Sequence, residues 1–398
     1  MNHKIVKYSE IGKIRSGKRL PKGYTVSEKI SDNKYIRVRD INSGSIDSSI
    51  VQYITDEAAE KLERYKVKTR DVIISVVGTV GAIAQIDESL NGAYLTENCD
   101  NLQVDESLCL KDYLKYYLLS EDGSKEIIAN TVGSTQPKLP IYGIENFNIK
   151  LPSIDNQKRI VKLLNSIDKK IKLNNEINNN LHDLAEQQFN EIYSLGSPKK
   201  LDELLFNVST GSRPKGGAQE SGIPSIGAEK IEKFGIYDYS SEKYISEDFY
   251  EKLKNGKLNS GDVLLYKDGA YTGKVSMCLN GFPHNKAAVN EHVFILNTEN
   301  NWAQNYLYFV LYNKDNKEML HRLASSKAAQ PGLNQVELKS IEINICDKDD
   351  ILKFENSVKP IMEKIALNSL ENKRLAELRD TLLPKLMNGE IDLDNIEI

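Results

Sequence analysis

The chain has 398 residues, with 53 Lys and Arg against 57 Asp and Glu, so its formal net charge is −4. This length suffices for two domains that each bury a core. The sequence contains no run of 18 apolar residues, so no membrane-spanning helix is predicted. A slightly acidic average excludes a uniformly basic nucleic-acid binder. The N-terminal residues lack the apolar stretch of a signal peptide, and the four cysteines lack zinc or disulfide spacing. We therefore expect a cytoplasmic protein.

The charge is unevenly spread along the first third of the chain. Residues 1–70 contain 16 Lys and Arg against 9 Asp and Glu, whereas residues 71–150 contain 5 against 12. A basic face can exist on an overall neutral module. The alternative is that both runs form ordinary solvated surface.

The first 153 residues are predicted to form a strand-rich α+β module. Their apolar runs are short, alternate with a period of two and are separated by Gly, Asn and Pro turns. The predicted strands are 35–41, 72–77, 83–86, 98–104 and 147–151. One helical patch interrupts them at 110–119, and its tyrosines are expected to pack in the core, with base stacking as the alternative.

A long helix is predicted next, at 155–193, and a second one at 349–387. At a rise of ~1.5 Å per residue each is on the order of 55 to 60 Å long, too long to be buried in one module. The domain prediction is a first globular domain at 1–153, a central helix region at 154–198, a second globular domain at 199–347 and a C-terminal helix region at 348–398. The second module repeats the helical patch at 302–312.

The chain is an internal duplication. KKIKLNNEINNNLHDL (169–184) and EKIALNSLENKRLAEL (363–378) share seven of 16 positions at an offset of 194 residues. The same offset aligns Gly17 with Gly211 and Arg19 with Arg213. A period this long indicates two copies of a whole module. The predicted fold is α+β, with two similar strand-rich domains joined by two long antiparallel helices that form a pseudo-two-fold symmetric coiled coil.

Asparagines mark the middle of both helices. Antiparallel pairing would put Asn174 opposite Asn372 and Asn178 opposite Asn368, with apolar layers on either side. A buried Asn layer fixes helix register, because a slip leaves an amide unsatisfied. The alternative is that these side chains face solvent.

Two further features of the helices carry expectations. Pro360 predicts a kink or break in the second helix, since proline lacks the N–H and clashes with the preceding turn. Leucine and isoleucine side chains of the first helix that lie off the predicted contact line would need another helix to cover them. They are Leu163, Leu173, Ile177 and Leu184.

No catalytic motif was found. The chain has no GxxxxGK[ST], HExxH or GxSxG pattern, and no methyltransferase motif. GTVG at 78–81 is better explained as a tight turn between strands. The five histidines lack metal-ligand spacing, so no metal site is expected. We predict a protein that binds or scaffolds and does not catalyse.

The candidate DNA contacts combine charge with turn chemistry. Gly permits close backbone approach to phosphate. Arg can form two hydrogen bonds with the edge of guanine, and Gln can do the same with adenine. Lys34, Arg37 and Arg39 are predicted to alternate along one strand face. For each residue the alternative is a solvated loop charge. The full set is Lys18, Arg19, Lys22, Lys34, Arg37, Arg39, Gln136, Lys138, Arg213, Lys215, Lys274, Lys286, Lys327 and Gln330.

Several segments resemble the specificity subunit of Type I restriction-modification enzymes. LPSIDNQKRIVKLLNSIDKKI (151–171) is similar to the entry of that family's first conserved helix, and TLLPKLMNGEIDL (381–393) to its C-terminal ending. GDVLLYKDGAYTGKV and GSTQPKL resemble recurrent segments of its target recognition domains. The second helix departs from the pattern, because ICDKDDILKF lacks the LPxxxxQ opening.

The resemblance implies a non-catalytic subunit. Each domain would read one half of a bipartite, asymmetric target in double-stranded DNA, and the helices would set the spacer and dock two methyltransferase subunits. Those partners would use S-adenosylmethionine, and motor-nuclease subunits would use ATP and Mg2+, with no cofactor on this chain. Two alternatives remain from the residues alone: a stand-alone DNA-binding regulator or anti-restriction factor, and a protein-protein scaffold.

Overall fold

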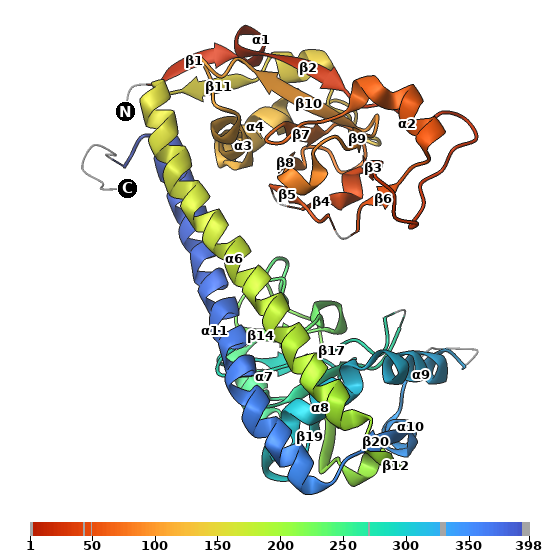
Figure 1. The fold of residues 1–398 in the computed structure, drawn as a ribbon. Coiled ribbons are helices and arrows are strands. Elements are labelled where there is room, and N and C mark those ends of the chain that lie inside the picture. Colours follow the sequence, from red (N-terminus) through yellow and green to blue (C-terminus); the bar gives the residue numbers. More distant parts are fainter. Residues whose placement is uncertain (1–2, 43, 49, 270, 327–331, 392–398) are drawn as a thin grey trace. The chain divides into compact units, whose positions relative to one another are not determined.

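The structure is a computed structural model that describes residues 3–42, 44–48, 50–269, 271–326 and 332–391. It divides into two compact units. Unit 1 comprises Met1–Asp168 with Glu377–Ile398, and unit 2 comprises Lys169–Ala376. Each unit therefore contains one module together with a segment of each long helix (Figure 1).

Unit 1 is built on a four-stranded antiparallel sheet. Its strand order is β2 (Gly12–Ser16), β10 (Cys99–Val104), β7 (Val72–Ser75), β8 (Ile83–Gln85). A smaller sheet has the order β6 (Gln52–Tyr53), β3 (Lys34–Ile36), β9 (Tyr94–Leu95), in which β3 and β9 are parallel. Two further pairs are β1 (Lys4–Lys7) with β11 (Asn148–Leu151) and β4 (Ile41–Asn42) with β5 (Ser45–Ile46).

Helix α3 (Lys111–Leu119) supplies the aromatic part of the unit 1 core. Its tyrosines Tyr113, Tyr116 and Tyr117 are buried against apolar residues of the main sheet, so the predicted packing role is confirmed. The other helices of the module are α1 (Tyr8–Ile11), α2 (Asp56–Leu62), α4 (Glu121–Asn130) and α5 (Ile141–Glu145). GTVG forms the turn between β7 and β8, with both glycines at a positive φ of 85°.

Unit 2 repeats the main sheet, the smaller sheet and the β1–β11 pair of unit 1, but its described residues contain no counterpart of the β4–β5 pair. Its main sheet has the order β13 (Asn207–Thr210), β19 (Val293–Asn297), β16 (Val263–Tyr266), β17 (Val275–Met277). Its smaller sheet has the order β15 (Tyr244–Ile245), β14 (Ile223–Ile226), β18 (Ala288–Val289), again with one parallel pair, and β12 (Ser197–Lys200) pairs with β20 (Glu342–Ile345). The helices are α7 (Glu247–Lys252), α8 (Gln304–Tyr312), α9 (Lys314–Ser325) and α10 (Gln335–Ser340). The duplication thus extends from sequence to fold.

Short 3-10 helices complete both modules. They are Val38–Asp40, Glu63–Tyr65, Glu88–Leu90, Leu201–Glu203, Ala228–Lys230 and Glu299–Asn301. Within the described ranges, no helix is both long enough and apolar enough to cross a membrane.

The long helices are α6 (Ile154–Tyr193) and α11 (Lys348–Met387), each 40 residues long. Both begin within one residue of the predicted positions. The break expected at Pro360 does not occur, because α11 is assigned as one helix through that residue. Val358 and Met362 on either side of Pro360 are fully buried in the unit 2 core, and this packing offsets the lost hydrogen bond. Gly389, at a φ of 69°, lies just after the C-terminal end of α11.

Within unit 2 the two helices run antiparallel and meet at their asparagines. Asn174 Nδ2 donates to Asn372 Oδ1 at 2.9 Å, and Asn368 Nδ2 donates to Asn178 Oδ1 at 2.9 Å. Asn174, Asn178 and Asn368 are all buried, so these three do not face solvent as the alternative required. Within unit 1, α6 and α11 residues such as Ile160 and Leu386 share one apolar cluster.

Candidate nucleic-acid interface

Two loops of unit 1 are bonded to the segment that joins β9 to β10, which we call the central loop (residues 95–99), and a third loop is bonded to one of them. The turn after β2 is attached by Gly17 N–H to Cys99 O at 2.9 Å and by Lys18 N–H to Leu95 O at 2.8 Å. The loop after β7 is attached by Val76 N–H to Asn98 O at 2.8 Å. These backbone bonds hold the loops in fixed relative positions.

The third loop contains the predicted Gln136 and Lys138. Leu139 N–H donates to Val76 O at 2.9 Å, which places residues 132–139 beside the loop after β7. The structure therefore places Lys18 and Arg19 on a turn bonded to the central loop, and Gln136 and Lys138 on a loop bonded to its neighbour, with all four side chains exposed. Within the described ranges no ion pair is recorded for Lys18.

Unit 2 has the same arrangement around its own central loop (residues 289–293). Lys267 N–H donates to His292 O at 3.1 Å, and Leu333 N–H donates to Lys267 O at 2.8 Å. These contacts are the duplicates of the Val76 and Leu139 contacts in unit 1. The chain thus contains two structurally equivalent copies of one candidate interface.

Gly17 and Gly211 are required by the close approach of the turn to the central loop. A Cβ atom on Gly17 would lie 2.0 Å from Thr96 O, and one on Gly211 would lie 1.6 Å from Val289 O. Backbone oxygens cannot yield to such contacts, so any larger residue would displace the turn. In the structure, the glycines bring the turn close to the protein's own backbone.

Each turn arginine is paired with a glutamate of the central loop. Arg19 Nε donates to Glu97 Oε1 at 2.5 Å, and Arg213 Nε lies 3.1 Å from Glu291 Oε1. Partial burial alone would raise the pKa of Glu97, but the hydrogen bonds from Arg19, Thr96 and the backbone, together with the charge of Arg19, lower it below its usual value. The Thr96 hydroxyl donates to the second oxygen of Glu97 at 2.9 Å.

Glu97 and Glu291 were missed by the sequence analysis. Their numbers differ by 194, the same offset that relates Arg19 to Arg213. Following the duplication for acidic as well as basic residues would have found them. In unit 2 the pair has a further neighbour, because His292 lies 3.3 Å from Glu291 and 3.0 Å from Asp268.

The expected alternation of Lys34, Arg37 and Arg39 on one strand face is wrong. Strand β3 ends at Ile36, because Asp40 accepts the backbone N–H of Arg37 at 2.8 Å and starts a 3-10 turn. Arg37 is also ion-paired with Asp40 at 3.0 Å and its side chain is only 17% exposed. Lys34 Nζ donates to Ser89 O at 2.8 Å, while Arg39 remains exposed.

The remaining predicted lysines fall into two groups. Lys22 and Lys215 are exposed on the turns. Lys274 is ion-paired with Glu232, and Lys286 with Glu247 and Glu251, so either lysine would have to leave a carboxylate to bind phosphate. Lys327 and Gln330 lie outside the described residues.

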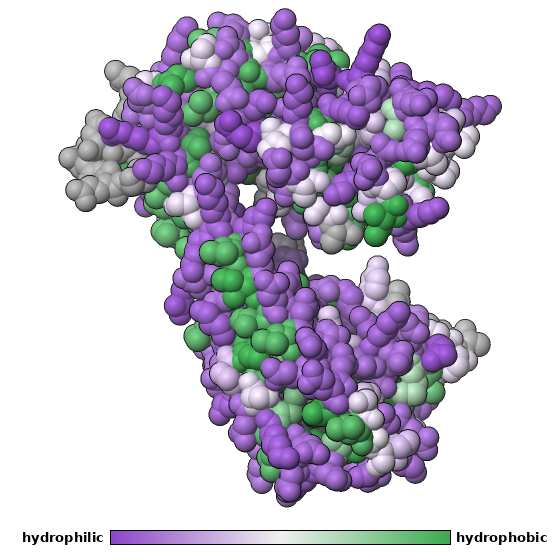
Figure 2. All heavy atoms as spheres, viewed as in Figure 1, coloured by the Kyte–Doolittle hydropathy of each residue, from purple (hydrophilic) through white to green (hydrophobic). Residues whose placement is uncertain are grey.

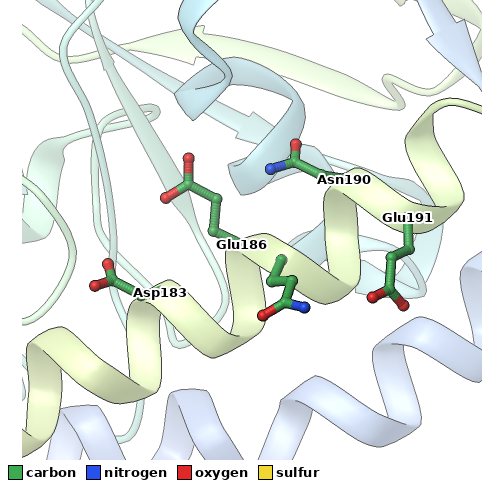
Figure 3. A pocket seen from close by; sticks show the side chains of 5 residues that line it. Asp183, Glu186, Asn190 and Glu191 are labelled. Carbon is green, nitrogen blue, oxygen red and sulfur yellow. The ribbon is translucent and has the colours of Figure 1, made fainter.

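His182, Asp183 and Glu186 form an acidic cluster on α6, with possible ligand atoms within 4.8 Å of one another. Figure 3 shows Asp183 and Glu186 projecting from successive turns on the same side of the helix. The buried ring of His182 meets the Tyr308 hydroxyl through Nε2 at 2.9 Å, and that hydroxyl accepts Phe234 N–H at 3.2 Å.

This hydrogen-bond arrangement disfavours a metal ion. Since no other acceptor for the Tyr308 hydroxyl is found in the described part of the chain, the hydroxyl donates to Nε2 of His182. The ring proton then lies on Nδ1, which is 3.8 Å from Glu186. A metal ion bound between these groups would need a lone pair on Nδ1, and the protonated nitrogen has none. The cluster is better explained as a neutral histidine beside surface carboxylates, consistent with burial lowering the pKa of His182 to about 3.

Exposed leucines recur at duplicated positions of the long helices. Leu173 and Leu184 of α6 are 51% and 45% exposed, and their counterparts Leu367 and Leu378 of α11 are 56% and 48% exposed. Figure 2 shows apolar side chains gathering over α6 on the face in view. The other two predicted off-line residues, Leu163 and Ile177, are half-buried.

Comparison with known proteins agrees with this architecture. Residues 2–183 match the family described as Type I restriction modification DNA specificity domain. The HindI specificity subunit of Haemophilus influenzae is 21% identical over 92% of this chain and 97% of its own length. The MjaIX specificity subunit of Methanocaldococcus jannaschii is 25% identical over 72% of this chain and 70% of its own length.

A solved structure supports the fold independently. The S subunit of the type I restriction-modification system of M. genitalium aligns with a TM-score of 0.58 and 16% identity, over 97% of this chain and 96% of that chain. Two modules, each with a segment of both long helices, thus form a fold similar to that of this S subunit. Residues 2–183 are thus similar to the type I restriction modification DNA specificity domain, and most of the chain is similar to the HindI and MjaIX specificity subunits.

Proposed function

We propose that this chain is the DNA sequence-specificity subunit of a type I restriction-modification complex, in which each unit reads one half of a bipartite target. The observation that carries this proposal is the duplicated interface: one topology, one central loop and one arginine-glutamate pair occur in each unit. The two interfaces differ at equivalent positions, with Asn98 in unit 1 and His292 in unit 2. Two similar interfaces that differ in sequence suit a DNA target whose two halves differ.

The spacer between the half-sites is assigned to α6 and α11. Both helices contribute residues to both units, so their length constrains how far apart two half-sites can be read. The buried pairs Asn174 with Asn372 and Asn178 with Asn368 would hold the helix register. A fixed register gives a fixed spacer length.

Partner subunits are assigned to the exposed leucines of the helices. Four leucines that are 45% to 56% exposed, at duplicated positions, would be covered by two methyltransferase subunits. We propose that these subunits bind S-adenosylmethionine and methylate adenine, and that motor-nuclease subunits bring ATP and Mg2+. The chain itself would be non-catalytic and would act in the cytoplasm.

Methylome sequencing of cells that express this chain together with methyltransferase subunits tests the proposal. We expect adenine methylation in a bipartite motif with a constant spacer, and gel shifts that become sequence-specific only when those subunits are added. A chain that binds one DNA sequence tightly without partners would instead be a stand-alone regulator. Methylation without a bipartite motif would also contradict the proposal.

A further inference from the structure

The arginine-glutamate pairs leave a particular part of each guanidinium available. In Arg19 the hydrogen bond to Glu97 engages Nε, and in Arg213 the atom nearest to Glu291 is also Nε. The two terminal Nη groups therefore keep their donors. Arg19 is 80% exposed and Arg213 is 49% exposed, so these groups can reach a ligand in solvent. A pair of parallel N–H donors matches O6 and N7 of guanine in the major groove.

The turn that carries Arg19 is also held in position before any ligand binds. The Arg19 turn is bonded to the central loop through Gly17 and Lys18, and Glu97 accepts a second hydrogen bond from Thr96. Fixing a long side chain in advance removes part of the entropy lost on binding. A loose arginine would serve for phosphate attraction, whereas base recognition requires orientation.

The glutamate beside each arginine distinguishes a contact with a DNA phosphate from a contact with a guanine base. A phosphate oxygen carries negative charge, and Glu97 or Glu291 beside the arginine would repel it. The guanine edge is uncharged and presents acceptors, so a neighbouring carboxylate costs little there. The geometry favours a base over the backbone in both units.

We propose that Arg19 and Arg213 each read one guanine, one in each half of the target, and that Glu97 and Glu291 are positioning residues that orient the guanidinium groups. This inference rests on the proposed function and adds a chemical identity to one base pair of each half-site. The surroundings of the two pairs differ: Glu291 also contacts His292, which is bonded to Asp268. The half-sites would thus share a G·C pair while differing beside it.

The test compares variants of the full chain, co-expressed with methyltransferase subunits, by methylome sequencing. Lysine keeps the charge of arginine but cannot form two parallel hydrogen bonds with guanine. Arg19→Lys should therefore lower the preference for G·C at one position of one half-site by roughly 10- to 100-fold. Arg213→Lys should do the same in the other half-site. Glu97→Gln should relax the same position as Arg19→Lys, but less. Lys29→Ala, at an exposed lysine between β2 and β3 that is not among the candidate DNA contacts, is the control and should leave every base preference unchanged.

The outcomes separate this inference from the proposed function. A wild-type chain that yields no bipartite motif would contradict the function itself. A bipartite motif whose base preferences stay unchanged in Arg19→Lys and Arg213→Lys, with uniformly weaker methylation, would show phosphate contacts and overturn the guanine assignment. A half-site without a G·C pair would overturn it as well. Because both arginines are solvent-exposed, unchanged urea unfolding midpoints should accompany the variants.

Discussion

Asn178 and Asn368 hydrogen-bond to each other at 2.9 Å inside the helix pair of unit 2, where their side chains are almost fully buried. Asn178 also donates to Ser369 Oγ at 3.1 Å, so its amide is satisfied on both sides. Each amide depends on the other, and this dependence makes the pair testable.

Removing one member of the asparagine pair should cost more than removing both. Asn368→Leu leaves the Asn178 oxygen without a donor and should destabilise unit 2 by about 1 to 3 kcal/mol. Asn178→Leu combined with Asn368→Leu should recover most of that loss while loosening the register, seen as mixed spacer lengths in methylome sequencing. Urea unfolding measures the first effect, with the exposed Asn180→Ala as control. Additive single and double effects would contradict the coupling.

Asp168 connects three elements of unit 1. It accepts the Tyr116 hydroxyl at 2.6 Å and lies 3.3 Å from Lys115 and 3.2 Å from Arg379. Asp168→Asn leaves the Lys115 ammonium, whose side chain is only 8% exposed, without its carboxylate. We expect unit 1 to lose about 2 to 4 kcal/mol in urea unfolding. The exposed pair of Lys158 with Asp155 provides the control, since Asp155→Asn should change stability by less than about 0.5 kcal/mol.

Glu355 should make unit 2 sensitive to pH. Burial raises the pKa of this carboxyl to about 7, although it accepts Tyr306 N–H at 2.8 Å and an Asn305 amide at 2.7 Å. Since the pKa in the folded state exceeds the unfolded value, the folded state binds the extra proton. The stabilisation is complete below about pH 4.5 and is lost as pH rises through about 7. Glu355→Gln should flatten this part of the stability profile measured by urea unfolding, and an unchanged slope would contradict the assignment.

Charging the exposed leucines should block assembly without unfolding the chain. Leu173→Glu with Leu367→Glu places carboxylates where an apolar partner surface would pack, at positions more than half exposed in the chain alone. We expect a near-wild-type unfolding midpoint and at least a 10-fold loss of affinity for methyltransferase subunits in pull-down or calorimetric titration. Lys169→Glu on the same helix serves as the charge control. Normal assembly of the leucine variant would place the partner surface elsewhere.

Much of the fold could be predicted because local patterns and the duplication agree. The long helices follow from an uninterrupted helical period, and the strand-rich modules from short alternating runs. A break at Pro360 does not occur, because the intrinsic helix penalty of proline was weighed without the buried neighbours Val358 and Met362, which sequence alone does not reveal.

The interface was only partly predictable, since exposed charge does not specify its partner. Arg37 and Arg19 were both candidate DNA contacts, yet Arg37 forms an ion pair with Asp40 three residues away while Arg19 reaches Glu97 across the fold. The first contact is local and could be read from the chain. The second needs the tertiary approach of the turn to the central loop. Which of the two arginines keeps donors for a ligand is therefore a property of the fold.

Unit 1 is discontinuous in sequence, and this sets an order on synthesis. Its apolar cluster includes Ile160 and Leu164 together with Leu383, Leu386 and Met387. Every residue of unit 2 therefore leaves the ribosome before the last core residues of unit 1 are available. Unit 1 is synthesised first, but its core is completed last. A prematurely terminated chain would therefore lack core residues of unit 1 as well as the end of α11.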